Sequence, residues 1–175
     1  MAVAMADVGV VLVLAVAAKG AGLAALIVAA VTDLRRRIIP NEAVLIVACA
    51  GLMLRLLGFH GWTLAISAAV ALGLLVVLGQ MTRLGIVGGG DAKLIAAVSL
   101  SQSPADVPSL LLHIALAGGG LALVYLAMSS LSSQPVRVAM RSQSIPYGVA
   151  ILLGTLSLNI LEVARQCVAA PSCWS

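Results

Sequence analysis

The chain has 175 residues, of which 62% are hydrophobic and only 9% are charged, and its mean hydropathy is +1.18. About a quarter of the residues in a soluble globular domain are charged, so this composition excludes that class and indicates a polytopic membrane protein. The net charge of +4 is scattered over loop ends rather than gathered in one basic patch, which argues against a nucleic-acid-binding protein.

Six apolar segments predict an all-α fold with about six transmembrane helices. A helix that spans the bilayer needs about 20 apolar residues, so the segments fit one integral-membrane domain over residues 1–175, without a separate soluble domain. The predicted spans are 8–31, 42–57, 62–82, 91–100, 108–129 and 147–164. The first is too long for the apolar part of a signal peptide and lacks a basic segment before it, so we expect no cleavage. The fourth is short, and we expect it to tilt or to lie in a thinned bilayer.

The first span contains Lys19 and leads into Asp33, which opens the sequence Asp-Leu-Arg-Arg-Arg-Ile-Ile-Pro-Asn. We expect Lys19 to extend towards an interface or to face the bundle. A carboxylate at the bilayer edge is costly to keep, so Asp33 is a candidate functional residue. Pro40 and Asn41 are expected to end this loop and to start the second span, with Asn41 as its N-cap.

A second acidic residue, Asp91, begins the fourth span directly after the glycines 88–90. Glycine is costly inside a helix, so we expect this stretch to bend rather than to be helical. Gly88 and Gly90 should then leave room for the backbone of a substrate. Lys93 supplies a cation that could bias the carboxylates or anchor the chain at the interface.

The last span begins at Pro146, Tyr147 and Gly148, a third segment shaped by proline and glycine. Basic residues cluster in the loops after the first, third and fifth spans: Arg35, Arg36, Arg37, Arg83, Arg137 and Arg141. Because cytoplasmic loops carry the excess of Lys and Arg, both termini should lie on the non-cytoplasmic side. The same topology puts all three segments at the cytoplasmic side.

Asp33 and Asp91 together indicate paired-carboxylate chemistry. Two carboxyls that lie close together share one proton. The ionised carboxyl can then take a proton from an attacking water while the other donates to a peptide carbonyl oxygen. The first span must pack against the fourth to bring them together. His60 and His113 are isolated, and we expect neither a metal site nor any cofactor.

These segments resemble the signature motifs of the type IV prepilin peptidases, intramembrane aspartyl proteases of the Gly-x-Gly-Asp class. The resemblance lies in residues 33–41 and in Gly88-x-Gly90-Asp91-x-Lys93, and residues 145–151 are similar to a third conserved stretch. It implies a bacterial inner-membrane, multi-pass endopeptidase that removes the leader peptide of a prepilin at the cytoplasmic face. Asp33 and Asp91 match the catalytic aspartates. The implied partners are the prepilin, the bilayer and pilus assembly machinery, and no nucleic acid.

Larger members of that family carry a cytoplasmic domain with four zinc-binding cysteines and also methylate the new N-terminus. The chain lacks those cysteines and is similar to the short subtype that serves Flp/Tad pili, which argues against methyltransferase activity.

Two other classes use some of the same features. A small proton-coupled transporter or channel subunit would also hold membrane carboxylates, but nearer mid-bilayer and often within an internal repeat. A structural subunit of a secretion machine would need neither aspartate.

Overall fold

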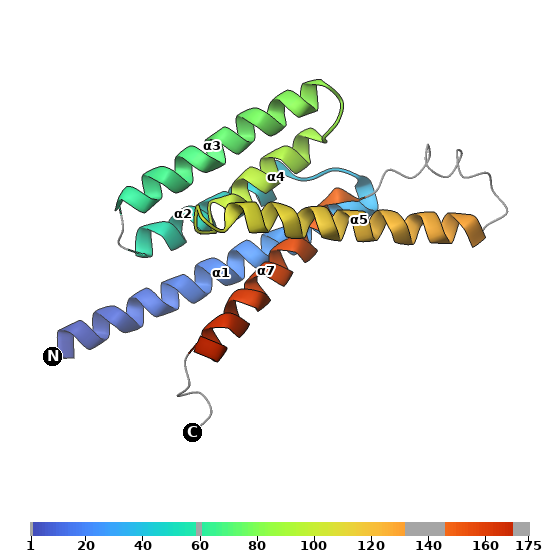
Figure 1. The fold of residues 1–175 in the computed structure, drawn as a ribbon. Helices are drawn as coiled ribbons and strands as arrows, with labels where there is room; N and C mark the ends of the chain where they lie inside the picture. The colour runs from blue at the N-terminus through green and yellow to red at the C-terminus, as the bar shows by residue number, and fades with distance from the viewer. Residues whose placement is uncertain (1, 59–60, 132–145, 170–175) are drawn as a thin grey trace.

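The computed structural model describes residues 2–58, 61–131 and 146–169. In this part of the chain all secondary structure is helical (Figure 1), and the helices are α1 (Ala2–Arg36), α2 (Asn41–Leu57), α3 (Gly61–Arg83), α4 (Gly89–Ser99), α5 (Val107–Leu131) and α7 (Tyr147–Ala169). The predicted all-α fold is therefore confirmed, and each predicted span corresponds to one helix. Arg137, Arg141 and His60 lie outside the described residues.

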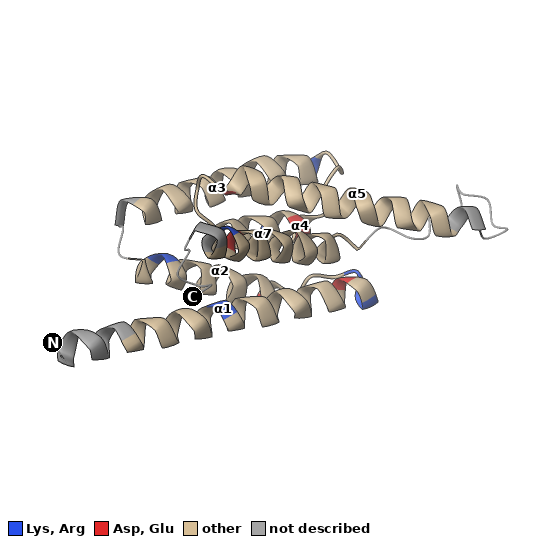
Figure 2. Cartoon of the chain, turned by 60° about the horizontal axis from the view of Figure 1, so that its bottom comes forward, with Lys and Arg blue, Asp and Glu red and all other residues tan. Residues whose placement is uncertain are grey.

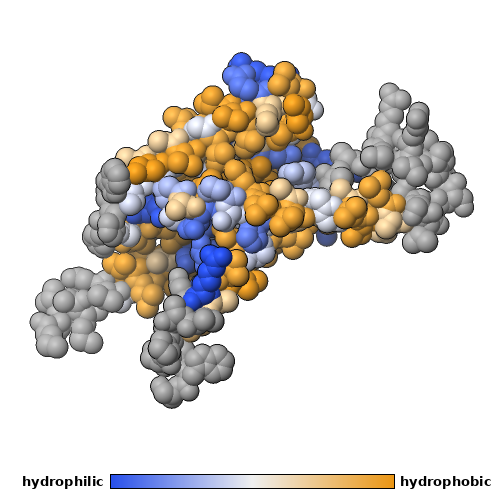
Figure 3. Space-filling model, in the orientation of Figure 1, coloured by the Kyte–Doolittle hydropathy of each residue, from blue (hydrophilic) through white to orange (hydrophobic). Residues whose placement is uncertain are grey.

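Four of these helices are long and apolar enough to cross a membrane, over Gly9–Arg36, Thr63–Arg83, Val107–Met128 and Tyr147–Arg165. Their outward surfaces are largely hydrophobic, as Figure 3 shows for one face. The chain is a multi-pass membrane protein.

The remaining two helices are shorter than a span. α2 has 17 residues and α4 has 11. At 1.5 Å per residue, α4 is about 16 Å long, roughly half the thickness of the hydrocarbon core. Seven of its residues are buried, so α4 is enclosed by other helices instead of facing lipid.

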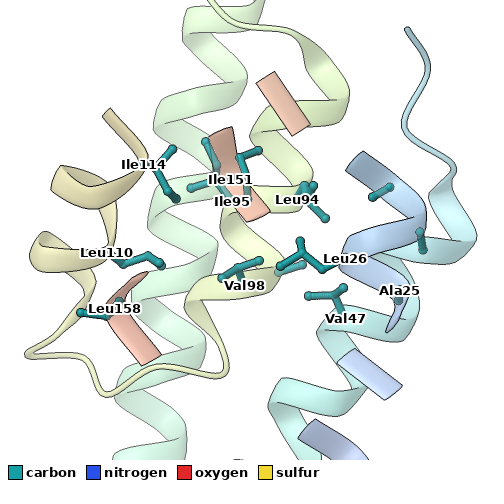
Figure 4. Close-up of a cluster of buried hydrophobic side chains, with 13 residues drawn as sticks. Ala25, Leu26, Val47, Leu94, Ile95, Val98, Leu110, Ile114, Ile151 and Leu158 are labelled. Atoms are coloured by element: carbon teal, nitrogen blue, oxygen red, sulfur yellow. The ribbon is translucent and has the colours of Figure 1, made fainter. Parts of the chain in front are cut away.

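The hydrophobic core lies around α4. α4 packs against α2, α3 and α7, while α1 packs against α2 and α7, and α5 packs against α7. Figure 4 shows the side chains that meet there, with Leu26 of α1 beside Leu94 and Val98 of α4. Two helices approach closely at Gly154 of α7, where a Cβ would lie 2.7 Å from the backbone of Ile114 in α5. Small residues at such crossings let helix backbones approach in a membrane.

The predicted packing of the first span on the fourth is present in the core, where Leu26 lies beside Leu94 and Val98, but it is not the main contact of α1. The main neighbours of α1 are α2 and α7, and both of these also pack on α4. Since α4 is short and surrounded, it shares its surface among several helices. α2 and α7 therefore fix the distance between the end of α1 and the start of α4.

The chain reverses between α3 and α4 at Gly85, which has a φ of +73°. Its N–H donates to the carbonyl of Thr82 at 3.0 Å, and the N–H of Ile86 donates to that of Met81 at 3.0 Å. This pairing is a Schellman motif, whose left-handed residue favours glycine. The prediction of a non-helical stretch was wrong for residues 89 and 90, because α4 already begins at Gly89.

Candidate active site

Asp33 lies in the last turn of α1 and not in the loop that follows. It is buried, with 8% of its surface exposed. The backbone N–H of Gly148, at the start of α7, donates to its Oδ2 at 2.7 Å. A donor at this distance favours the ionised carboxylate. The contact joins the first and third predicted segments, which are 115 positions apart.

Gly148 permits this contact because it has no side chain. A Cβ at this position would lie 3.0 Å from both Cβ and Oδ2 of Asp33. Pro146 is buried and directly precedes α7, and its carbonyl accepts from the N–H of Val149 at 3.2 Å. Tyr147 points to α5, where a Cβ on Gly118 would lie 3.4 Å from its ring. Of these three predicted residues, Gly148 contacts Asp33, and Gly118 of α5 leaves room for the ring of Tyr147.

Asp91 is half-buried in the first turn of α4. The helix dipole favours a negative charge at this position. Gly88 precedes α4, and a Cβ on it would collide with Oδ2 of Asp91. Burial raises the pKa of Asp91 to about 6, and the charge of Asp33 adds to the increase. The structure thus brings the two carboxyls, 58 positions apart in the sequence (91 − 33), into electrostatic contact.

Charged residues are sparse elsewhere in the helices. In Figure 2, acidic and basic residues occur together at the carboxyl end of α1, and another acidic residue lies on α4. Asp33 is buried and Asp91 is half-buried, so water screens the interaction of these two carboxyls less than it would at the surface. Low polarity strengthens such interactions.

Asn41 and Lys93 connect the first two predicted segments. Nζ of Lys93 donates to Oδ1 of Asn41 at 3.3 Å. The prediction of Asn41 as an N-cap was wrong, because Pro40 occupies that position in an extended conformation and Asn41 is the first residue of α2. The Asn41 side chain instead accepts from Lys93. This lysine is exposed and holds the start of α2 beside α4.

Gly90 makes room for this protein's own chain. A Cβ on Gly90 would lie 3.1 Å from Cβ of Ile39, in the loop between α1 and α2. We expected the space at Gly90 to receive the backbone of a substrate. On the side that a Cβ would occupy, this space is instead filled by Ile39. Ile39 lies in the motif at residues 33–41, but its contact with Gly90 was not predicted.

The site offers one carboxylate bonded to a backbone donor and a second carboxyl whose pKa is raised to about 6, so that it holds a proton more readily than a free aspartate. Such a pair can act as general base and general acid at once. Among the described residues, no group of three or more His, Cys, Asp or Glu side chains is arranged to hold a metal ion.

A comparison with protein families bears on the same part of the chain. Residues 20–123, more than half of the sequence, match the model of the type IV leader peptidase family. The match includes both Asp33 and Asp91. No curated protein and no solved structure matches the chain.

Proposed function

We propose that this chain, which belongs to the type IV leader peptidase family, is an aspartic endopeptidase that hydrolyses the leader of a prepilin with Asp33 and Asp91. The observation that carries the proposal is the electrostatic coupling of these two carboxyls. Family membership supports a peptidase and a prepilin substrate. It favours this activity over a transporter, a channel subunit or a structural subunit.

The two aspartates would have different roles. Asp33 accepts the N–H of Gly148, which favours its charged form, so Asp33 is the general base. It takes a proton from water as the water oxygen attacks the peptide carbonyl carbon. Asp91, with its raised pKa, donates its proton to the carbonyl oxygen. The C–N bond of the tetrahedral diol then breaks as the leaving nitrogen takes the proton now held by Asp33. One hydroxyl of the diol returns its proton to Asp91, which restores both aspartates to their starting forms.

The aspartate end of the bundle would face the cytoplasm of a bacterial inner membrane. Arg35, Arg36 and Arg83 lie in the last turns of α1 and α3, close to the two motifs. This excess of basic residues supports a cytoplasmic position and cleavage on that side. The chain does not contain the four zinc-binding cysteines of the larger family members, and in this it is similar to the short subtype that serves Flp/Tad pili. We therefore propose a Flp-like prepilin as substrate.

Replacing each aspartate by asparagine tests the activity. Asp33→Asn and Asp91→Asn should each lower cleavage of a co-expressed prepilin by at least about a thousandfold, since neither variant retains both proton-transfer groups. Gel mobility of the prepilin reports cleavage, and immunoblotting of membranes reports the amount of enzyme.

Asp106→Asn is the matched control. Asp106 lies directly before α5, where Asp and Asn cap a helix about equally well. This variant should cleave at the wild-type rate. Normal processing by Asp33→Asn or Asp91→Asn at wild-type abundance would remove that residue from the mechanism.

A further inference from the structure

A second polar region lies at the opposite end of the bundle. A cavity of about 370 Å³ lies between α1, α2, α4 and α7, a volume at the lower end of the range for small-molecule sites. Aliphatic side chains such as Leu26 and Val98 form its inner wall. Its polar lining includes Lys19, Gln102, Asn159 and Glu162.

The cavity is a consequence of the short α4. This helix ends at Ser99, and the chain turns back towards α5 well before a full span is complete. Arg55 covers the end of α4 by donating from Nε to the carbonyl of Leu100 at 3.3 Å and from Nη2 to that of Ser101 at 3.2 Å. Beyond this point no part of α4 fills the space between α1, α2 and α7.

Lys19 and Glu162 lie at the same depth in the bundle. Asp33 near the carboxyl end of α1 contacts Gly148 near the amino end of α7. The two helices are antiparallel, so residues that precede Asp33 and residues that follow Gly148 extend towards the same end of the bundle. Lys19 precedes Asp33 by 14 positions (33 − 19), and Glu162 follows Gly148 by 14 (162 − 148). At 1.5 Å per residue, each is about 21 Å from the contact, inside the roughly 30 Å of hydrocarbon that a membrane supplies.

These two opposite charges line the cavity without pairing. Within the described residues, neither Lys19 nor Glu162 forms a hydrogen bond or an ion pair. The charge of Glu162 interacts with Arg55, but the Arg55 guanidinium donates its hydrogen bonds to the carbonyls of Leu100 and Ser101 at the end of α4. A charged side chain at this depth is costly unless something compensates it. Arg55 and Arg165 lie near Glu162 and partly compensate its charge, whereas Lys19 has no carboxylate bonded to it among the described residues. A ligand that carries both signs can pair with Lys19 and with Glu162.

The cavity opens sideways towards lipid. Two of its lining residues, Leu23 of α1 and Val163 of α7, are apolar and 40% and 59% exposed. In Figure 1, α1 and α7 meet near the start of α7 and diverge towards the chain ends. Figure 3 shows hydrophilic surface gathered between these diverging parts and bordered by hydrophobic surface. A ligand that enters here must combine a polar head with aliphatic chains.

We propose that this cavity binds the headgroup of a zwitterionic phospholipid with a primary ammonium group, phosphatidylethanolamine, from the leaflet at the end remote from Asp33. The lipid phosphate accepts hydrogen bonds from Lys19. The lipid ammonium donates to the carboxylate of Glu162 and to the side-chain carbonyl of Asn159. The upper parts of the acyl chains lie deeper in the bundle, along Leu23 and Leu156 of the cavity lining, between α1 and α7.

Lipid retention by the purified full chain tests the site. The protein is placed in nanodiscs made of equal parts phosphatidylethanolamine and phosphatidylcholine with identical acyl chains, extracted in mild detergent, and weighed with its bound lipid by native mass spectrometry. Phosphatidylcholine has no N–H to donate. The protein should retain phosphatidylethanolamine with about a tenfold preference, as expected for loss of one hydrogen bond to a charged group. Equal retention of the two lipids, or retention of neither, would overturn the proposal.

Variants identify the groups responsible. Glu162→Gln should remove the preference for phosphatidylethanolamine, and Lys19→Met should lower retention of both lipids. The matched control, Glu42→Gln, changes the chain's other glutamate, which is exposed in the first turn of α2, and should behave as wild type. Thermal melts establish that each variant is folded, and a preference that survives in folded Glu162→Gln contradicts the assignment.

A soluble headgroup separates a lipid from a small molecule. Glycerophosphoethanolamine carries the same charges without acyl chains, so it should fail to displace the bound lipid at equal concentration. Displacement as effective as that by the intact lipid would overturn the lipid assignment. None of these measurements uses cleavage, so the proposed peptidase activity is tested separately.

Discussion

Asp33 and Gly148 meet at one end of the α1–α7 pair, and Lys19 and Glu162 line a cavity at the other. At the first end two carboxyls of like charge influence each other, and the protein supplies a backbone N–H to one of them. At the second end the charges are opposite in sign but do not touch. Both arrangements cost free energy in a membrane protein, the first because like charges repel each other and the second because charged groups lie at membrane depth without a bonded partner.

The difference indicates what each end is built to bind. Like charges held close together make one proton shared, which favours acid–base chemistry. Opposite charges held apart lose their mutual attraction and become available to a partner that brings both signs. The glycines at the two ends of the bundle also have different neighbours. Gly148 and Gly88 approach the carboxyls themselves, whereas Gly51 lies against the backbone of Leu100 and Ser101 near the cavity.

Among substitutions at the glycines, the largest effect is expected from a side chain at Gly148. In Gly148→Val the new Cβ would press on Asp33, which lies only 3.0 Å from that position. Displacing a reacting group by about 1 Å can cost about a hundredfold in rate, so we expect at least that loss of prepilin cleavage. Cleavage is measured against enzyme abundance in membranes.

Gly119→Val is the control for Gly148→Val, because no heavy atom lies within 4 Å of a Cβ built on Gly119. It should cleave normally. Gly154→Ala gives the opposite pattern, since its Cβ would meet the backbone of Ile114 at 2.7 Å, and it should lower the melting temperature before it affects chemistry. If Gly148→Val cleaves like wild type, the contact with Asp33 does not position the aspartate.

The sequence predicted the helices well and the contacts between them poorly. Hydrophobic runs located each helix, because the bilayer imposes length and apolarity on them. The sequence also suggested that Asp33 and Asp91 belong together. It did not show that α2 and α7 are the main neighbours of α1, because charge placement and run length say nothing about which neighbours a short, enclosed helix will have.

The same limit applies to single residues. Asparagine is a residue type that often caps the start of a helix, yet the side chain of Asn41 accepts a hydrogen bond from Lys93, 52 positions away. The cavity at Lys19 and Glu162 required two helices to be aligned through the contact of Asp33 with Gly148. Each of these features depends on tertiary geometry, which local sequence patterns do not encode.

A smaller effect is expected from pH, and it tests the proton on Asp91. If Asp91 donates a proton, kcat/KM should fall about tenfold per pH unit above pH 6, as the pKa of about 6 is passed. The profile belongs to the coupled pair and is measured on purified enzyme with a prepilin peptide between pH 5 and 8. A flat profile over this range would contradict the assignment of Asp91 as the acid.

The pH dependence of folding stability is an independent test of the pKa of Asp91. The pKa of Asp91 is raised in the folded state from an ordinary value of 3.8, so the folded protein binds more protons than the unfolded chain between about pH 4 and 6. Stability from this group is therefore lost as pH rises through that window. Asp91→Asn removes this dependence, and its melting temperature relative to wild type should rise from pH 4 to pH 6 and then level off.

The smallest effect is expected at Gly90, where packing and substrate access can be distinguished. Gly90→Ala brings a Cβ to 3.1 Å from Cβ of Ile39, so the loop between α1 and α2 must shift slightly. Overpacking of this kind costs about 1 kcal/mol at its mildest, which corresponds to a loss of roughly fivefold in cleavage if the shift reaches Asp33. Removing the outer atoms of Ile39 gives the loop freedom to move.

The double variant Gly90→Ala with Ile39→Ala should therefore recover most of the lost cleavage, while Ile39→Ala alone should stay close to wild type. Recovery would assign Gly90 to the contact that holds the two motifs together. If the double variant is as slow as Gly90→Ala, the added methyl group obstructs the substrate instead, and the space at Gly90 belongs to the prepilin. Measuring KM and kcat separately distinguishes these outcomes further, because an obstructed substrate raises KM, whereas a displaced Asp33 lowers kcat.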